Sequence, residues 1–216
     1  MYKRQRYPIH APTQVFNHAV LKTNFYRSNI VALAFRLDPS FLSADYAVKP
    51  HGIFLVVGAE FRGFHTRFAD VARGGIRLIK SRSPQEYSNN LAGLFTECYN
   101  LAYTQQRKNK DIPEGGSKGV ILLTQGHQDK ARVAFAKYVD AILDILLPNE
   151  EVVDRLGARE ILFFGPDENT SDLMDLACEH ARFRGYAYWK AFTTGKSPTL
   201  GGIPHDVYGM TTRDVR

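Results

Sequence analysis

The stretch Gly75-Ile76-Arg77-Leu78-Ile79-Lys80-Ser81-Arg82-Ser83-Pro84-Gln85-Glu86 marks the point where the apolar pattern of the chain changes. Before it, apolar residues alternate or run together as they do in β-strands, and after it they recur three or four positions apart. Ser83, Pro84 and Glu86 are typical of a helix start, with a serine cap, a proline at the first helical position and an acid at the third. The stretch therefore predicts a strand that leads into a helix.

Four strand-like segments lie on the amino-terminal side of this junction. Residues 29–37 and 60–68 alternate between two sets of side chains, residues 52–58 form a continuous apolar run, and residues 75–80 are a short fourth strand. Residues 13–27 mix apolar and basic side chains without a clean period, and we expect a frayed helix there.

Beyond the junction, helical and strand-like patterns alternate. We expect two short buried strands at residues 119–123 and 161–164, and helices at residues 84–103, 128–147 and 171–184. This alternation favours an α/β fold with a mixed, partly parallel sheet and helices packed on it, in which residues 29–80 supply most of the sheet. Residues 193–206 are rich in glycine and proline and predict a loop.

Length and composition limit the class of protein. A chain of 216 residues with 44% hydrophobic content can form one ample domain or two small ones. No apolar run reaches the roughly 18 residues of a membrane span, so we expect a soluble protein. Residues 1–8 lack the apolar core of a secretory signal. We interpret Cys98 and Cys178 as reduced, buried thiols of a cytosolic protein, and we expect no metal site.

The net charge of +6 raises the question of nucleic-acid binding. Lys and Arg are spread through the chain, with dense clusters only at residues 3–6 and 107–110. A nucleic-acid-binding surface usually concentrates its cations in one stripe interleaved with aromatic residues. The charge pattern therefore argues against a nucleic-acid partner. A basic nucleic-acid-binding domain remains only the weakest hypothesis for the function.

Three turns carry charged groups beside small or rigid residues, at residues 72–77, 108–119 and 165–170. Arg73, Lys108 and Lys118 are cations, and Asp167 is a carboxylate that follows a short apolar strand. Several cations and one carboxylate around a crevice would suit a substrate with two carboxylates and an amine. The three turns are thus the candidate site.

The lysine in the turn Gly115-Gly116-Ser117-Lys118-Gly119 has two interpretations. A phosphate-binding P-loop needs Ser or Thr after its lysine and a helix next, and neither is expected here. Glycines around a lysine can instead hold it in a poorly hydrated pocket, where desolvation and nearby cations lower its pKa toward neutrality. Lys118 is then a candidate proton-transfer group, and the alternative is a solvated lysine on a surface hairpin.

The other two turns are equally open when each is taken alone. Asp167 follows Pro166 at the carboxyl end of an expected strand, where α/β sheets usually place ligands, but it could also cap the helix that follows. Arg73, before Gly74 and Gly75, could bind a carboxylate or be an ordinary solvated arginine.

In order and spacing, the three turns together resemble the Glu/Leu/Phe/Val dehydrogenase superfamily. Its substrate domain carries Lys/Arg-Gly-Gly-x-Arg, then Lys-Asn…Pro…Gly-(Gly/Ala)-x-Lys-Gly, and then a strand that ends in an essential aspartate. Residues 61–77, 105–113 and 201–212 resemble, more narrowly, the large NAD-specific glutamate dehydrogenases of fungal type. The resemblance extends from about residue 23 onward.

This resemblance implies where the substrate binds. Arg73, with Gly74 and Gly75, stands where the family places a cation for the side-chain carboxylate of the substrate. Lys108 stands at the lysine that holds the α-carboxylate.

The resemblance also implies which residues do chemistry. Lys118 corresponds to the catalytic lysine, which activates water and polarises the carbonyl or imine. Asp167 corresponds to the aspartate that shuttles protons to and from the amino nitrogen. Thr211 resembles a threonine of the family's linking helix that approaches the nicotinamide of NAD.

The activity implied by the resemblance is oxidative deamination of L-glutamate with NAD to 2-oxoglutarate and ammonia. Residues 29–192 would be the substrate-binding and catalytic domain, residues 1–28 a partial lead-in, and residues 193–216 a loop and the start of a link to a dinucleotide-binding domain. The sequence contains no G-x-G-x-x-G, so we expect a fragment without its Rossmann domain that is inactive alone.

Two further expectations accompany this activity. The full enzyme should be a homo-oligomer in the cytoplasm, with the mitochondrion as the alternative compartment. A non-catalytic module that binds an amino acid or dicarboxylate is the alternative function, since it would need the same cations and no chemistry.

Overall fold

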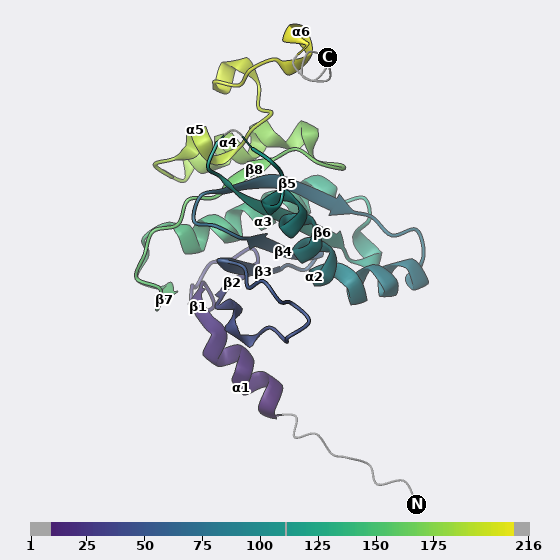
Figure 1. Ribbon diagram of the computed structural model, residues 1–216, viewed down its shortest axis with the longest axis vertical. Helices are drawn as coiled ribbons and strands as arrows, with labels where there is room; N and C mark the ends of the chain where they lie inside the picture. Colours follow the sequence, from purple (N-terminus) through teal and green to yellow (C-terminus); the bar gives the residue numbers. More distant parts are fainter. Residues whose placement is uncertain (1–9, 111, 210–216) are drawn as a thin grey trace, which may run out of the picture.

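The computed structural model describes residues 10–110 and 112–209, and within them eight strands form one sheet in the order β7-β1-β2-β3-β4-β6-β5-β8. The strands are β1 (Val20–Thr23), β2 (Leu33–Leu37), β3 (Gly52–Val57), β4 (Phe61–Arg67), β5 (Ala72–Ile79), β6 (Gly115–Leu123), β7 (Val153–Asp154) and β8 (Phe163–Gly165). The helices are α1 (His10–Ala19), α2 (Pro84–Gln106), α3 (Ala131–Leu146), α4 (Met174–Phe183), α5 (Trp189–Phe192) and α6 (His205–Tyr208). Helices α1 and α6 lie at opposite ends of the molecule (Figure 1).

The sheet has an antiparallel part and a parallel part. Antiparallel pairs join β7 to β1, β1 to β2, β2 to β3, β3 to β4 and β4 to β6. Strand β5 pairs in parallel with β6 on one side and with β8 on the other. Helix α2 connects β5 to β6, because parallel neighbours need a crossover connection. This arrangement confirms the predicted α/β class and the mixed, partly parallel sheet.

The predicted junction between strand and helix is also present. Strand β5 ends at Ile79, and α2 begins at Pro84. The Ser83 hydroxyl accepts a hydrogen bond from the backbone N–H of Glu86 at 3.1 Å. The Glu86 carboxylate in turn accepts from the backbone N–H of Arg82 at 2.8 Å. The first bond satisfies a donor that the first turn of a helix leaves without a partner, and the second ties the residue before the cap to the helix.

The frayed helix expected at residues 13–27 is wrong in its second half. Helix α1 ends at Ala19, and the chain continues directly into strand β1, which lies inside the sheet between β2 and β7. The strand is hard to recognise in the sequence, because Lys22 within β1 is a charged residue that is buried. Its amine pairs with Asp154 at 3.0 Å and donates to the carbonyl of Ala158 at 2.8 Å.

Several predicted boundaries also move. Strand β6 begins at Gly115 rather than at residue 119, and β2 begins at Leu33 rather than at residue 29. Helix α2 continues three residues beyond the predicted end at 103, to Gln106. Tight backbone packing of small residues, rather than apolar periodicity, extends β6, as the contacts of Gly116 below show. The predicted loop at residues 193–206 contains a 3₁₀ turn and the start of α6.

Helices cover the two faces of the sheet unequally. On one face, α3 and α4 pack on the largest core cluster, where Tyr138 meets Phe61 and Ile76 belongs to the same group. On the other face, α2 packs mainly on β4 and β6, and Cys98 is buried there against Val120. Cys178 is likewise buried, and both thiols are free, which confirms the prediction of two buried thiols outside a disulfide. In the described ranges, no helix is long and apolar enough to cross a membrane.

Strand β5 is consequently half covered. Ile76 and Leu78 point to the α3 face and are fully buried. The alternate residues Arg73, Gly75 and Arg77 point to the face that α2 only partly covers, and they remain partly or fully exposed. The side chains of β5 that face α2 therefore line an open part of the sheet surface.

Gly116 should be necessary for the packing of α2 on β6. A Cβ at this position would lie 2.1 Å from the backbone nitrogen of Gln106 and 2.4 Å from the carbonyl oxygen of Ala102. Gly116→Ala should therefore lower the free energy of unfolding by about 1–3 kcal/mol. In the matched variant Gly93→Ala, the new Cβ has nothing within 4 Å, and alanine should stabilise the helix by up to about 1 kcal/mol. Urea unfolding of both variants tests this, and equal midpoints would contradict it.

Candidate active site

An ion pair between Lys118 and Asp167 occupies the open part of the sheet surface. Lys118 is the fourth residue of β6, and Asp167 follows β8, so the pair spans the strand between them, β5. Gly75 of β5 leaves room for this pair. A Cβ at Gly75 would lie 2.9 Å from the Cβ of Asp167 and 2.8 Å from the carbonyl oxygen of Pro166. The glycine is therefore required by the side chains that cross it.

Lys118 is buried, with only 5% of its side chain exposed. Burial, and secondarily the guanidinium of Arg77, lower the pKa of Lys118 to about 8, whereas the carboxylate of Glu97 acts against this shift. Lys108 is a weaker influence in the same direction as Arg77. The alternative of a solvated lysine on a surface hairpin is thus wrong, since the residue lies in a buried strand of the sheet.

The turn after β8 fixes the position of Asp167. The Asp167 carboxylate accepts a hydrogen bond from the backbone N–H of Glu168 at 2.7 Å. The backbone N–H of Asp167 donates to the Thr170 hydroxyl at 3.0 Å. Thr170 donates to the carbonyl of Ile76 at 2.6 Å, which ties the turn to β5. The turn also requires Asn169 to adopt a φ of 60°. A non-glycine residue in this region is strained, and such strain is common at functional sites.

The same turn extends the edge of the sheet beyond β8. The backbone N–H of Leu78 donates to the carbonyl of Glu168 at 3.0 Å. The carbonyl of Leu78 accepts from the side-chain amide of Asn169 at 2.9 Å. The carboxylate of Asp167 is therefore held by a turn whose backbone and side chains are both bonded to β5.

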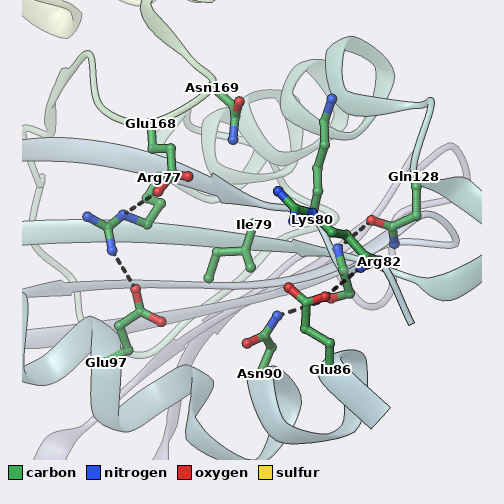
Figure 2. A pocket seen from close by; sticks show the side chains of 11 residues that line it. Arg77, Ile79, Lys80, Arg82, Glu86, Asn90, Glu97, Gln128, Glu168 and Asn169 are labelled. Carbon is green, nitrogen blue, oxygen red and sulfur yellow. Dashed lines mark hydrogen bonds and ion pairs between the residues drawn. The ribbon is translucent and has the colours of Figure 1, made fainter. Parts of the chain in front are cut away.

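Arg77 lies beside the ion pair and is shown between Glu97 and Glu168 in Figure 2. Its guanidinium is 2.9 Å from the Glu97 carboxylate on α2, 3.5 Å from Asp167 and 3.6 Å from Glu168. It lines a cavity of about 770 Å³ that runs between α2 and the 168–169 turn. Sequence reasoning assigned Arg77 no role, although it is the last residue of the motif Arg-Gly-Gly-x-Arg.

A second cavity, of about 370 Å³, is lined by Gly75 and Pro166, and Gly75 lies next to the side chain of Asp167. Its wall includes all four predicted substrate-binding residues, Arg73, Gly74, Gly75 and Lys108. Gly74 is needed for backbone packing, because a Cβ there would lie 1.6 Å from the carbonyl oxygen of Ser117 on β6. The structure thus places the predicted cations in one cavity, next to the predicted catalytic pair.

This cavity also contains an acid that the sequence did not suggest. The carboxylate of Glu114 accepts a hydrogen bond from Arg73 at 3.0 Å and lies 3.5 Å from the amine of Lys110. The predicted cofactor contact, Thr211, lies outside the described residues. In the part of the chain that the structure describes, no group of three or more His, Cys, Asp and Glu side chains could hold a metal ion.

Known proteins are similar to this chain over most of its length. A family model described as the bacterial NAD-glutamate dehydrogenase catalytic domain matches residues 9–215. The chain belongs to this family.

Three eukaryotic relatives are similar over almost the whole chain. It is 62% identical over 210 residues to the NAD-specific glutamate dehydrogenase of Neurospora crassa and 61% identical over 201 residues to glutamate dehydrogenase 2 of Dictyostelium discoideum. It is 56% identical over 209 residues to the NAD-specific glutamate dehydrogenase of Saccharomyces cerevisiae. These alignments include 93–94% of this chain and 19–20% of the relatives. The chain therefore spans about a fifth of their length.

Replacement of Arg77 by glutamine should raise the pKa of Lys118 above its value of about 8. The change removes a nearby cation and leaves Glu97 and Glu168 without that ion-pair partner, and both effects favour the protonated lysine. We expect an increase of roughly 1 at the effective dielectric of a partly buried pair, measured by NMR titration of the Lys118 amine. Arg82 is exposed and lines the same cavity as Arg77, between α2 and the 168–169 turn. Arg82→Gln removes the same charge and should leave the pKa of Lys118 unchanged. An unaltered Lys118 pKa in Arg77→Gln would contradict the assignment.

Proposed function

We propose that this chain is the substrate-binding and catalytic part of an NAD-specific glutamate dehydrogenase, which converts L-glutamate, NAD⁺ and water to 2-oxoglutarate, ammonia and NADH. The observation that carries the proposal is the buried Lys118, paired with Asp167, next to a cavity lined by Arg73 and Lys108. Membership of the glutamate dehydrogenase family supports it. The lowered pKa of Lys118 favours a catalytic function over a module that only binds, since binding an anion does not need a lysine that can lose its proton.

The proposed binding mode uses the two ends of the substrate. Arg73 holds the side-chain carboxylate, for which the fork of a guanidinium is well suited, and Lys108 holds the α-carboxylate. Gly74 and Gly75 leave the floor of the cavity free of side chains, so the substrate can lie close to the backbone of β5. The substrate's α-carbon then lies toward the Lys118–Asp167 pair.

In the proposed mechanism, this chain moves protons. With a pKa of about 8, Lys118 can release and regain a proton near neutral pH, and it activates the water that attacks the iminium carbon of the oxidised substrate. Asp167 carries protons to and from the amino nitrogen, so that ammonia can leave. Arg77, 3.5 Å from the carboxylate of Asp167, keeps that carboxylate in place. The cations stabilise the charge that develops around the α-carbon.

NAD supplies the acceptor for the hydride of the α-carbon. In the described residues, no strand is followed by the G-x-G-x-x-G turn that binds the pyrophosphate of a dinucleotide. We therefore assign NAD to a further domain of the full-length enzyme. Residues 29–192 would form the substrate domain, residues 1–28 its lead-in, and residues 193–216 the loop and the link. A homo-oligomeric enzyme, in the cytoplasm or the mitochondrion, is part of the same proposal.

The catalytic pair can be tested in the full-length enzyme. Lys118→Ala should lower kcat by about 100-fold or more and change the KM for glutamate much less, because a proton-transfer group acts mainly in the transition state. Asp167→Asn should abolish turnover and still bind 2-oxoglutarate in a calorimeter, since an amide keeps the shape but cannot take up a proton. Lys130→Ala, at an exposed lysine, is the control. Normal turnover in Asp167→Asn would remove this residue from the mechanism.

The role of Lys108 predicts a different kinetic result. Its ion pair with the α-carboxylate exists both before and during the reaction, so Lys108→Ala should mainly raise the KM for glutamate, by about 10-fold or more, with kcat changed much less. Steady-state kinetics with glutamate as the varied substrate measures both constants. A fall in kcat at an unchanged KM would show that Lys108 acts in the chemical step instead.

A further inference from the structure

Glu114 is paired with Arg73, the cation that we assign to the side-chain carboxylate of the substrate. Its carboxylate accepts a hydrogen bond from the Arg73 guanidinium at 3.0 Å. Only 13% of the Glu114 side chain is exposed, compared with 46% of that of Arg73. Both residues belong to the wall of the cavity that also contains Lys108. A carboxylate of the chain itself therefore lies where a substrate carboxylate would bind.

We propose that Glu114 is a specificity-determining residue, an internal carboxylate that competes with the substrate's side-chain carboxylate for Arg73. This inference rests on the role of Arg73 in the proposed function. A substrate can bind to Arg73 only if its carboxylate displaces Glu114 or shares the guanidinium with it. Glu114 thus sets how tightly an anion must bind to Arg73 in order to enter this part of the cavity.

The cost of displacing Glu114 is limited by a second cation. The amine of Lys110 lies 3.5 Å from the Glu114 carboxylate, and it also donates to the backbone carbonyls of Glu114 at 3.4 Å and Gly115 at 3.2 Å. These backbone bonds hold Lys110 at the base of Glu114 whether or not Arg73 is engaged. When Glu114 leaves Arg73, its charge remains next to Lys110, so no carboxylate is left buried without a partner.

The competition selects for molecules with two carboxylates. A substrate anchored at Lys108 through its α-carboxylate presents its second carboxylate to Arg73 at a high effective concentration. Such a tethered group can compete with Glu114, which is itself tethered by the chain. A single anion such as acetate or chloride must compete from bulk solution and therefore binds more weakly. Glu114 lowers the affinity for every anion, but it penalises untethered ones most.

The test is the variant Glu114→Gln in the full-length enzyme, with glutamate as substrate. We expect the KM for glutamate to fall about 3- to 10-fold with kcat within about twofold of that of the unsubstituted enzyme, because Arg73 no longer has a competing charge. Inhibition by sodium acetate should become at least about 3-fold stronger by its inhibition constant. Glu179→Gln, which removes the same charge from an exposed position of α4, should change neither value. An unchanged or higher KM in Glu114→Gln would overturn the proposal.

Two more variants separate the contact from general charge. Glu114→Asp keeps the charge but shortens the reach to Arg73 by one methylene, so it should also lower the KM, to a value between those of the unsubstituted enzyme and Glu114→Gln. In the Arg73→Gln background, Glu114→Gln should no longer lower the KM, since the two residues act through one contact. A KM for Glu114→Asp that equals the unsubstituted value while Glu114→Gln lowers it would show a general effect of charge and refute the competition.

The outcomes also separate this proposal from the one on which it rests. If Arg73→Gln leaves the KM for glutamate unchanged, Arg73 does not bind the substrate, and the assignment of the cavity fails. If Arg73→Gln raises the KM but Glu114→Gln does not lower it, the assignment stands and only the competition by Glu114 is refuted.

Discussion

The close approach of three parallel strands at two consecutive glycines is the constraint on which the site depends. Gly74 lets the backbone of β5 pass directly beside the Ser117 carbonyl of β6, where a methyl group would lie at 1.6 Å. Gly75 leaves the upper surface of β5 bare, so that Lys118 and Asp167 can meet across it. Any side chain at these positions would separate the strands or the ion pair. The glycines therefore contribute to the site through the backbone, because they allow Lys118 and Asp167 to meet.

Around this point, the protein combines burial with a surplus of cations. Burial alone would make Lys118 neutral, and a carboxylate alone would keep it charged. The pKa of about 8 results from burial and the Arg77 guanidinium acting against nearby acids such as Glu97. Arg77 also holds Asp167, at 3.5 Å, so one side chain both tunes the lysine and positions its partner. The two effects are physically linked, because the guanidinium that attracts the carboxylate also repels the amine.

The sequence predicted most of the fold where a local signal exists. The cap at Ser83 and the helical spacing after it located α2 correctly, the continuous apolar run located β3, and an alternating segment located β4. Strand β1 was missed because its buried Lys22 is held by partners more than 100 positions away, and a local pattern cannot reveal them. The site followed a similar rule. Taken alone, Arg73, Lys118 and Asp167 each had an ordinary structural explanation, and only their order in the chain suggested that they meet. Glu114 and Arg77 were not predicted as site residues, because their roles depend on contacts that form only in the folded protein.

The turn that carries Asp167 has a consequence for the molecule as a whole. Strand β8 covers only the first half of β5, and the rest of that strand would otherwise present free backbone groups at the rim of the sheet. The bonds from Glu168, Asn169 and Thr170 to Leu78 and Ile76 occupy those groups. An exposed strand rim is a template on which another chain can add a strand and start an aggregate. The residues that aim the carboxylate thus also protect the protein from association through this rim, so a substitution made there to change activity would endanger solubility as well.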